Sequence, residues 1–241
     1  MTVRSWPTSN RRSAERSSPL EDGFESRFLE GLPKPDLELV LSAATKRRYL
    51  ANSVVTTQGD PADYLFLVTK GCARYFFITP DGRKVLLHWL GVGEVFGGAA
   101  LLSRPSCYLV STEMVTDSWA LVWRRKEIRE LAARCPELMD NALLLAFDYM
   151  TLFLTAHVAL ISHSARERLA GVLVSLAAGF GQDASGGVKI VITNEELANA
   201  ANVTTFTASR LLSEWQRDGA VVKSRGGVVL RAPHKLLLHK V

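Results

Sequence analysis

Hydroxyl, aromatic and basic side chains are concentrated in one short segment near the C-terminus, with the sequence TTFTASR. The members able to make polar or aromatic contacts are Thr204, Thr205, Phe206, Thr207, Ser209 and Arg210. An arginine binds O6 and N7 of guanine, a hydroxyl group binds a phosphate or a base edge, and a phenyl ring contacts the methyl group of thymine. These residue types therefore predict contacts with double-stranded DNA.

The pattern around this segment predicts a helix-turn-helix. Thr193 and Glu196 have the T-x-x-E spacing of a capping box, which indicates the start of a short helix. A second helix is expected from Thr204 through Trp215 to a stop at Gly219. In this motif the second helix lies in the major groove, and its N-terminal residues face the bases.

The sequence AVVKSRGGVVL after this helix predicts a β-hairpin wing. Lys223 and Arg225 precede a Gly226-Gly227 turn, where we expect them to contact the DNA backbone. From Ser164 onward the sequence has ten basic and six acidic side chains, so four of the five net positive charges lie in this third of the chain. Clustered positive charge is the electrostatic footprint of a nucleic-acid-binding domain.

Motifs of catalysis and metal binding are absent from the sequence. It has no Gly-x-Ser-x-Gly elbow, no His-Glu-x-x-His pair and no phosphate-binding loop. Its three cysteines, Cys72, Cys107 and Cys135, have neither Cys-x-x-Cys nor zinc-ligand spacing. We therefore expect no enzyme, no metal site and no disulfide framework, as suits a reducing cytoplasm.

Short β-branched and aromatic runs separated by glycines fill the region from Arg48 to Trp123. Such runs predict a sandwich or barrel of antiparallel strands. The Asp81-Gly82 pair is expected to supply the positive φ angles of a tight hairpin turn.

The periodicity becomes helical after Pro136. Side chains recur every three or four positions along the seam Leu143, Phe147, Met150, Leu154, His157 and Ile161. A helix over 136–162 would be roughly 40 Å long, and a monomer could hardly cover so long an apolar stripe, so we expect a dimer. Two alternatives are a helix lying on its own β domain and a membrane span over 142–161, in which Asp148 would be costly.

Residues 1–24 are rich in Ser, Arg and Pro and lack the apolar core of a secretory signal. We expect a disordered extension there, and a cytoplasmic protein with no membrane association.

These segments, in this order, resemble the CRP/FNR (cyclic-AMP receptor protein / fumarate-nitrate reduction regulator) family of transcription factors over nearly the whole ordered chain. QGDPADYLFLVTKGCARYFFITPDGRKVLLHWLGVGEVFGGAALL is similar to the family's sensor β-roll, and ITNEELANAANVTTFTASRLLSEWQRDGAVV is similar to its winged helix. The resemblance implies an α+β fold. Its parts would be a cyclic-nucleotide-binding-like antiparallel β-roll over 25–135, a dimerisation helix over 136–162 and a winged helix-turn-helix DNA-binding domain over 163–241.

The sequence departs from the members of this family that bind cyclic AMP. Those members hold the ribose with a glutamate and the phosphate with an Arg-Ser pair, where this chain has Gly98 and Ser106-Cys107. The resemblance places a sensor pocket at Gly97, Gly98, Ser106, Cys107, Phe153 and Leu154. Without its arginine a cyclic phosphate loses a charge-assisted contact. We therefore do not expect cyclic AMP in the usual mode, although Arg104 is a substitute within reach in the sequence.

The effector itself stays open. Other members carry an iron–sulfur cluster on N-terminal cysteines, and we expect none here because the first cysteine is Cys72. Haem remains an alternative, with His88, His157, Cys72 and Cys107 as candidate ligands. An uncharged small molecule, or no effector at all, are the others.

The resemblance thus implies a dimeric regulator that binds a palindromic operator and acts with RNA polymerase. The family often has Arg-Glu where this chain has Thr205-Phe206, whereas the later Arg210 is retained. We therefore predict a guanine read by Arg210 and a T-rich neighbour at Phe206. The alternative class is a cyclic-nucleotide-binding-like module without DNA function.

Overall fold

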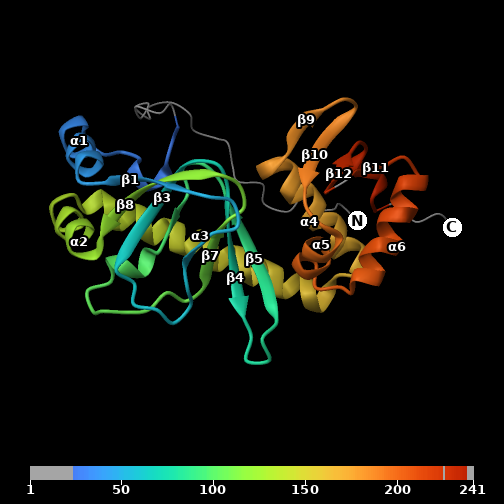
Figure 1. Ribbon diagram of the computed structural model, residues 1–241, viewed down its shortest axis with the longest axis horizontal. Coiled ribbons are helices and arrows are strands. Elements are labelled where there is room, and N and C mark those ends of the chain that lie inside the picture. Colours follow the sequence, from blue (N-terminus) through green and yellow to red (C-terminus); the bar gives the residue numbers. More distant parts are fainter. Residues whose placement is uncertain (1–23, 225, 238–241) are drawn as a thin grey trace. The chain divides into compact units, whose positions relative to one another are not determined.

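The structure is a computed structural model that describes residues 24–224 and 226–237 (Figure 1). These residues form two compact units, one ending at Thr151 and the other beginning at Leu152. Residues 1–23 of the predicted extension, and Arg225 of the predicted wing, lie outside the described residues. Phe24, which was assigned to the extension, is instead buried in the core of the first unit.

Two four-stranded antiparallel sheets build the first unit, which confirms the predicted β-roll. One sheet has the order β1-β8-β3-β6, with bounds Thr45–Tyr49, Ser118–Arg124, Tyr64–Lys70 and Val95–Phe96. The other has the order β2-β7-β4-β5, with bounds Val54–Thr56, Ser111–Met114, Ala73–Ile78 and Lys84–Leu90.

The hairpin between β4 and β5 differs in detail from the expected turn. The strands end at Ile78 and Lys84, so the connection is longer than two residues. Gly82 has a φ of 80°, whereas Asp81 is not among the residues with positive φ. A longer loop needs the left-handed conformation at fewer positions, and glycine adopts it at the lowest steric cost.

Strand β3 is buried on both faces and separates two cores. Leu65 and Leu67 belong to one hydrophobic cluster, whereas Phe66 and Val68 belong to the other. This division follows from the alternation of side chains along a strand. Helices cover the Leu65 face: η1 (Arg27–Leu29), α1 (Lys34–Ser42), η2 (Gly98–Leu101) and α2 (Arg125–Arg134) contribute to that cluster.

Helix α3 (Pro136–Ser162) confirms the predicted long helix and its exposed apolar seam. Leu143 is 71% exposed, Phe147 60% and Ile161 77%. By length and composition alone α3 could cross a membrane, with a mean hydropathy of 1.7 in an 18-residue window. Near its middle Asp148 forms an ion pair of 2.5 Å with Arg27.

The second unit has the elements of a winged helix. Its helices are α4 (Ala165–Phe180), α5 (Asn194–Ala200), α6 (Thr205–Arg217) and the short η3 (Pro233–Lys235). Its antiparallel sheet has the order β11-β12-β10-β9, with bounds Val221–Ser224, Gly227–Leu230, Gly187–Val191 and Gln182–Ala184.

The predicted helix caps of this unit are confirmed. Thr193 and Glu196 form a reciprocal capping box before α5, with Glu196 N donating to the Thr193 hydroxyl at 3.1 Å. Thr204 is the N-cap of α6, and Gly219 follows its last turn with a φ of 70°.

Candidate DNA-binding surface and sensor region

Helix α6 carries the predicted contact residues opposite its packed face. The packed face consists of Ala208, Leu211, Leu212 and Trp215, which are buried. Thr205, Phe206 and Arg210 are exposed, and Phe206 keeps 76% of its surface accessible. An exposed phenyl ring in a polar face has no role in the core, which favours an intermolecular contact.

Two of the predicted contact residues have a structural role. The Thr204 hydroxyl accepts a hydrogen bond from Thr207 N at 3.1 Å, and the two hydroxyl oxygens lie 2.9 Å apart. The Thr204 side chain therefore caps the N-terminus of α6, and the Thr207 hydroxyl bonds to that capping hydroxyl. Ser209 is half-buried on the same helix.

The turn between α5 and α6 is held by an arginine that sequence reasoning had counted only as a charge. Asn202 adopts a left-handed conformation with a φ of 49°. Arg168, in the first turn of α4, donates to the carbonyls of Ala201 at 3.0 Å and Asn202 at 3.1 Å, and to that of His163 at 2.8 Å. This side chain thus ties the turn to the segment that precedes α4.

Arg210 is also held. Its Nη1 donates to Oε1 of Glu214 at 2.6 Å, and Oε2 of the same carboxylate accepts from Nη2 of Arg166 at 2.5 Å. Arg166 in turn donates to the carbonyl of Leu236 at 3.2 Å and lies over the ring of Trp215. Sequence reasoning missed Glu214 and Arg166, since no local pattern pairs residues from α4 and α6.

The wing consists of β11 and β12. Lys223 does not extend freely from it, because its Nζ donates to the Ser213 hydroxyl at 2.7 Å. Lys223 also lines a surface hollow of about 340 Å³ together with Ser213, Gln216 and Arg217. The predicted backbone contact at Lys223 therefore lies beside the C-terminal half of α6.

In the sensor region the two predicted glycines differ in what the backbone requires. Gly97 has a φ of 79°, and a Cβ there would lie 2.5 Å from the carbonyl oxygen of Tyr64, so this position requires glycine. Gly98 is exposed, and a Cβ on it would meet nothing within 4 Å. The place where the resemblance puts a ribose-binding glutamate therefore has room for a side chain that this chain lacks.

The segment 106–108 closes against the loop before β3. The backbone carbonyl of Ser106 accepts from the N–H of Ala62 at 2.9 Å, and Cys107 is an exposed free thiol. The next residue, Tyr108, is buried, and its hydroxyl bonds both to the N–H of Tyr64 at 3.1 Å and to its carbonyl at 3.0 Å. Sequence reasoning missed Tyr108, although an aromatic residue beside the expected pocket was a usable signal.

Aromatic rings fill much of the core beside these glycines. Phe66 and Phe96 stack with ring centroids 4.5 Å apart, and Tyr108 belongs to the same buried cluster. From helix α3, Tyr149 packs against this cluster. Phe153 and Leu154 belong to the second unit, where they are 39% and 59% exposed, and their place in a sensor pocket stays a prediction.

Tyr149 also joins α3 to strands β4 and β5. Its ring lies edge-on to Tyr75, with centroids 5.9 Å apart, and to His88, at 5.6 Å. Nε2 of His88 is 3.9 Å from a carboxylate oxygen of Glu94. Burial raises the pKa of both tyrosine hydroxyls, so they stay protonated.

Two of the four candidate haem ligands lie near Glu94: Cys72, directly before β4, and His88 on β5, whose Nε2 is 3.9 Å from the carboxylate. Burial, with the nearby charge of Glu94, raises the pKa of the Cys72 thiol to about 12, and iron binds the thiolate rather than the thiol. His88 faces Tyr149, and His157 is exposed on α3. Within residues 24–224 and 226–237, no three His, Cys, Asp or Glu side chains gather in a way that could hold a metal ion.

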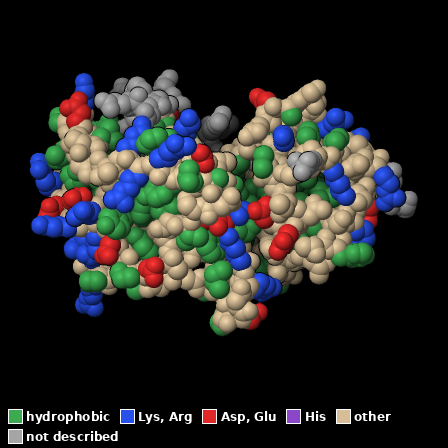
Figure 2. Space-filling model, in the orientation of Figure 1, with side chains coloured by type: hydrophobic (Ala, Val, Ile, Leu, Met, Phe, Trp, Pro, Cys, Tyr) green, Lys and Arg blue, Asp and Glu red, His purple; other side chains and the backbone are tan. Residues whose placement is uncertain are grey.

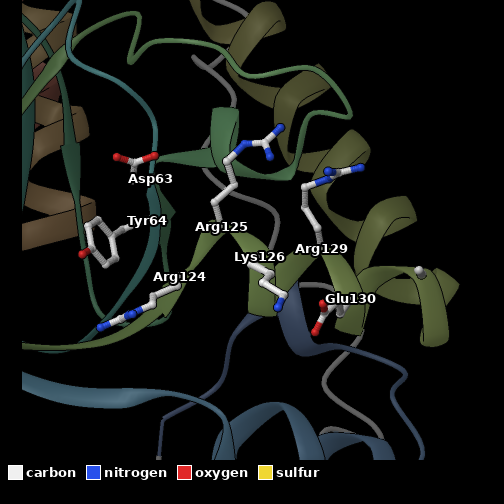
Figure 3. Close-up of a pocket in the computed structure, with 8 residues that line it drawn as sticks. Asp63, Tyr64, Arg124, Arg125, Lys126, Arg129 and Glu130 are labelled. Atoms are coloured by element: carbon white, nitrogen blue, oxygen red, sulfur yellow. The ribbon is translucent and has the colours of Figure 1, made fainter.

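A hollow of about 660 Å³ lies where β8 meets α2 (Figure 3). It is lined by Asp63, Tyr64, Arg124, Arg125, Lys126, Arg129, Glu130 and Ala133. In Figure 3 the side chains of Arg125 and Arg129 extend from α2 to the same side. Figure 2 shows that basic side chains gather over this end of the unit, near α1 and α2. The surface is suited to an acidic partner.

Comparisons with known proteins agree with this architecture. Residues 46–135 match the family described as cyclic nucleotide-binding domain, and residues 167–238 match the Crp-like helix-turn-helix domain. The chain is 30% identical over 207 residues to the cyclic AMP receptor protein of Thermus thermophilus, covering 86% of this chain and 93% of the relative. It is 24% identical over 213 residues to the anaerobic regulatory protein of Bacillus subtilis, covering 84% and 83%.

Among solved structures, the fold is similar to that of the c-di-GMP-responsive global regulator CLP of Xanthomonas campestris. The TM-score is 0.72 at 20% identity, and the match covers 82% of this chain and 99% of that one.

Proposed function

Because the chain belongs to the CRP/FNR family of transcriptional regulators, whose members are not enzymes, we propose that it binds a palindromic operator as a dimer. The exposed face of α6 would lie in the major groove of each half-site. The single observation that carries this proposal is the separation of the faces of α6, with its apolar face packed and Phe206 and Arg210 exposed on the opposite face.

Each contact has a distinct role. Arg210 reads a guanine, and Phe206 contacts a thymine methyl beside it. Thr205 and Ser209 bind phosphate or base edges. Lys223, tied to Ser213, contributes positive charge where the wing meets α6, and Arg225 follows it in the sequence.

The apolar seam of α3 supports the dimer. A second copy would cover side chains that are exposed in the single chain, among them Leu143, Phe147, Leu154 and Ile161. Exposed apolar patches of this length mark interaction surfaces, and a two-fold dimer presents two recognition helices to half-sites about 34 Å apart. A protein that acts on DNA in this way works in the cytoplasm.

The sensor region does not fit cyclic AMP in the usual mode. Gly98 offers no carboxylate, and Ser106 and Cys107 offer no guanidinium. Tyr108 presents its ring to Gly97, with a carbon 3.3 Å from a Cβ built there. An uncharged effector suits the buried aromatic cluster beside Gly97 better, and haem remains the alternative.

RNA polymerase is the expected partner of a transcriptional regulator, and the hollow beside α2 is the surface we assign to it. Arg124, Lys126 and Glu130 are exposed, and Arg129 is half-buried. Cationic side chains on an open surface suit an acidic face of another protein and contribute to its rate of association.

Selection of random duplex DNA by the purified protein tests the proposal. A palindrome enriched without additions, and unaffected by cyclic AMP, is the expected result. Enrichment that depends on cyclic AMP would overturn the assignment of the sensor, and absence of any salt-dependent DNA binding would favour a module without DNA function.

A further inference from the structure

We propose that Glu214 is a positioning residue that sets the base specificity of Arg210 and is itself fixed by Arg166. This inference rests on the proposed function, in which Arg210 reads a base. Nothing in the local sequence pattern assigns a role to either partner.

The geometry links α4 to the base-reading face through one carboxylate. Glu214 Oε1 accepts from Arg210 at 2.6 Å, and its Oε2 accepts from Arg166 at 2.5 Å. The side chains of Glu214 and Arg166 are 22% and 15% exposed, whereas that of Arg210 is 54% exposed. The carboxylate and its anchor are therefore held within the unit, and Arg210 alone extends towards solvent.

Arg166 is fixed in turn. It donates to the carbonyl of Leu236 at 3.2 Å, and that carbonyl also accepts from Nε1 of Trp215 at 2.9 Å. The guanidinium lies 5.6 Å from the centroid of the Trp215 ring. Because its anchor is immobilised in this way, Glu214 offers Arg210 a fixed acceptor.

Helix stabilisation alone is a poor explanation for the Arg210–Glu214 pair. Acid–base pairs at this spacing stabilise a helix best when the acid precedes the base, and here the arginine comes first. A carboxylate near a DNA-binding face also repels phosphates. The charge of Arg166 offsets that of Glu214, so the charge of Arg210 remains for the DNA.

The ion pair with Glu214 leaves one hydrogen-bonding edge of the Arg210 guanidinium free to bind a base. Glu214 binds Nη1, and the edge formed by Nε and Nη2 remains for O6 and N7 of guanine. A side chain that is already ordered loses less conformational entropy on binding, which is worth about threefold to tenfold in affinity for one long side chain. This gain in affinity is obtained only when a guanine is present to bind Arg210. It therefore increases the preference for guanine over the other bases.

The test is competition binding of the full-length protein to the selected operator and to its variants at the base read by Arg210. Glu214→Gln keeps the shape of the side chain and removes its charge. We expect it to lower the preference for guanine about threefold to tenfold. Glu214→Asp, which keeps the charge but withdraws the carboxylate, should cause a similar loss.

Asp183→Asn is the matched control, because Asp183 is an exposed carboxylate on β9 of the same unit. It removes one negative charge and should leave the preference unchanged. The double variant Glu214→Gln/Arg210→Ala should retain the same preference for guanine as Arg210→Ala alone, since Glu214 acts through Arg210. Melting temperatures report whether each variant is folded.

Two results would overturn the inference: full guanine preference in both Glu214 variants, or a loss that adds to that of Arg210→Ala. A failure of the proposed function looks different, because the wild-type protein would then select no sequence at all.

Discussion

The ring of Tyr149 on α3 packs edge-on against the ring of Tyr75 on β4, with centroids 5.9 Å apart. This contact joins the long helix to the β-roll within the first unit. Tyr149 also contacts His88 on β5, so this one side chain packs against both strands of the β4–β5 hairpin.

Truncation of this contact should loosen α3 from the β-roll. We expect Tyr149→Ala to lower the free energy of unfolding by about 2–4 kcal/mol, because the aromatic contacts are lost and a cavity is left. Chemical denaturation measures the change. Leu50→Ala is the control, since Leu50 is 63% exposed and lies outside α3, and equal losses in the two variants would contradict a special role for Tyr149.

The same tyrosines make stability depend on alkaline pH. Their pKa values in the folded protein are raised above the ordinary value of 10.0, chiefly by burial. Below about pH 10 the hydroxyls are protonated in both states, so they contribute no pH dependence. Above it the unfolded chain releases protons first, and the free energy of unfolding falls as pH rises.

Tyr75→Phe should reduce the fall in the free energy of unfolding with pH. Denaturation at pH 9, 10 and 11, on either side of the reference tyrosine pKa of ~10, would measure it. Tyr49→Phe is a second variant to compare, because the pKa of Tyr49 is also raised by burial. If the free energy of unfolding falls with pH as steeply in both variants as in the wild type, the buried tyrosines do not cause the pH dependence.

The three cysteines should react at different rates. Cys107 is exposed, whereas Cys135 is buried and the pKa of the Cys72 thiol is raised to about 12. Because the thiolate is the nucleophile, we expect an alkylating reagent at pH 8 to label Cys107 first, the half-buried Cys72 more slowly and the buried Cys135 only on unfolding. Mass spectrometry of the labelled peptides gives the order, and labelling of Cys72 as fast as that of Cys107 would contradict the prediction.

An acidic substitution in the seam of α3 should separate the proposed dimer. Phe147→Asp places a charge where a second copy would pack, so we expect a monomer in analytical ultracentrifugation and loss of operator affinity. Leu109→Asp makes the same chemical change at a residue that is 82% exposed and outside α3. It should leave both the assembly and DNA binding intact, and an unchanged dimer in Phe147→Asp would refute the seam as the interface.

Charge reversal in the hollow should uncouple transcription from DNA binding. We expect the Lys126→Glu and Arg129→Glu variants to bind the operator with wild-type affinity. Transcription in their presence should stay close to the level measured without the regulator. Transcription in vitro with purified polymerase measures this. Arg83→Glu, at an exposed arginine between β4 and β5, is the control. Wild-type regulation by both hollow variants would remove the hollow from the polymerase contact.

Much of the architecture could be predicted from the sequence because its signals are local. The capping box of Thr193 and Glu196, the left-handed glycine at 219 and the seam of α3 each depend on residues a few positions apart. Their periods and spacings follow from helix geometry itself. The order of these elements, together with the resemblance, was enough to identify a β-roll, a long helix and a winged helix.

The tertiary structure decided which side chains act together. Tyr75 meets Tyr149, Tyr108 bonds to Tyr64, and Glu214 lies between Arg210 and Arg166, a residue 48 positions away. It also showed that Lys223 is tied to Ser213, and that Gly98 has room for a side chain it lacks. Except for the i, i+4 pair of Arg210 with Glu214, these side-chain contacts join different elements. No local period encodes them, because they depend on how whole elements pack against one another.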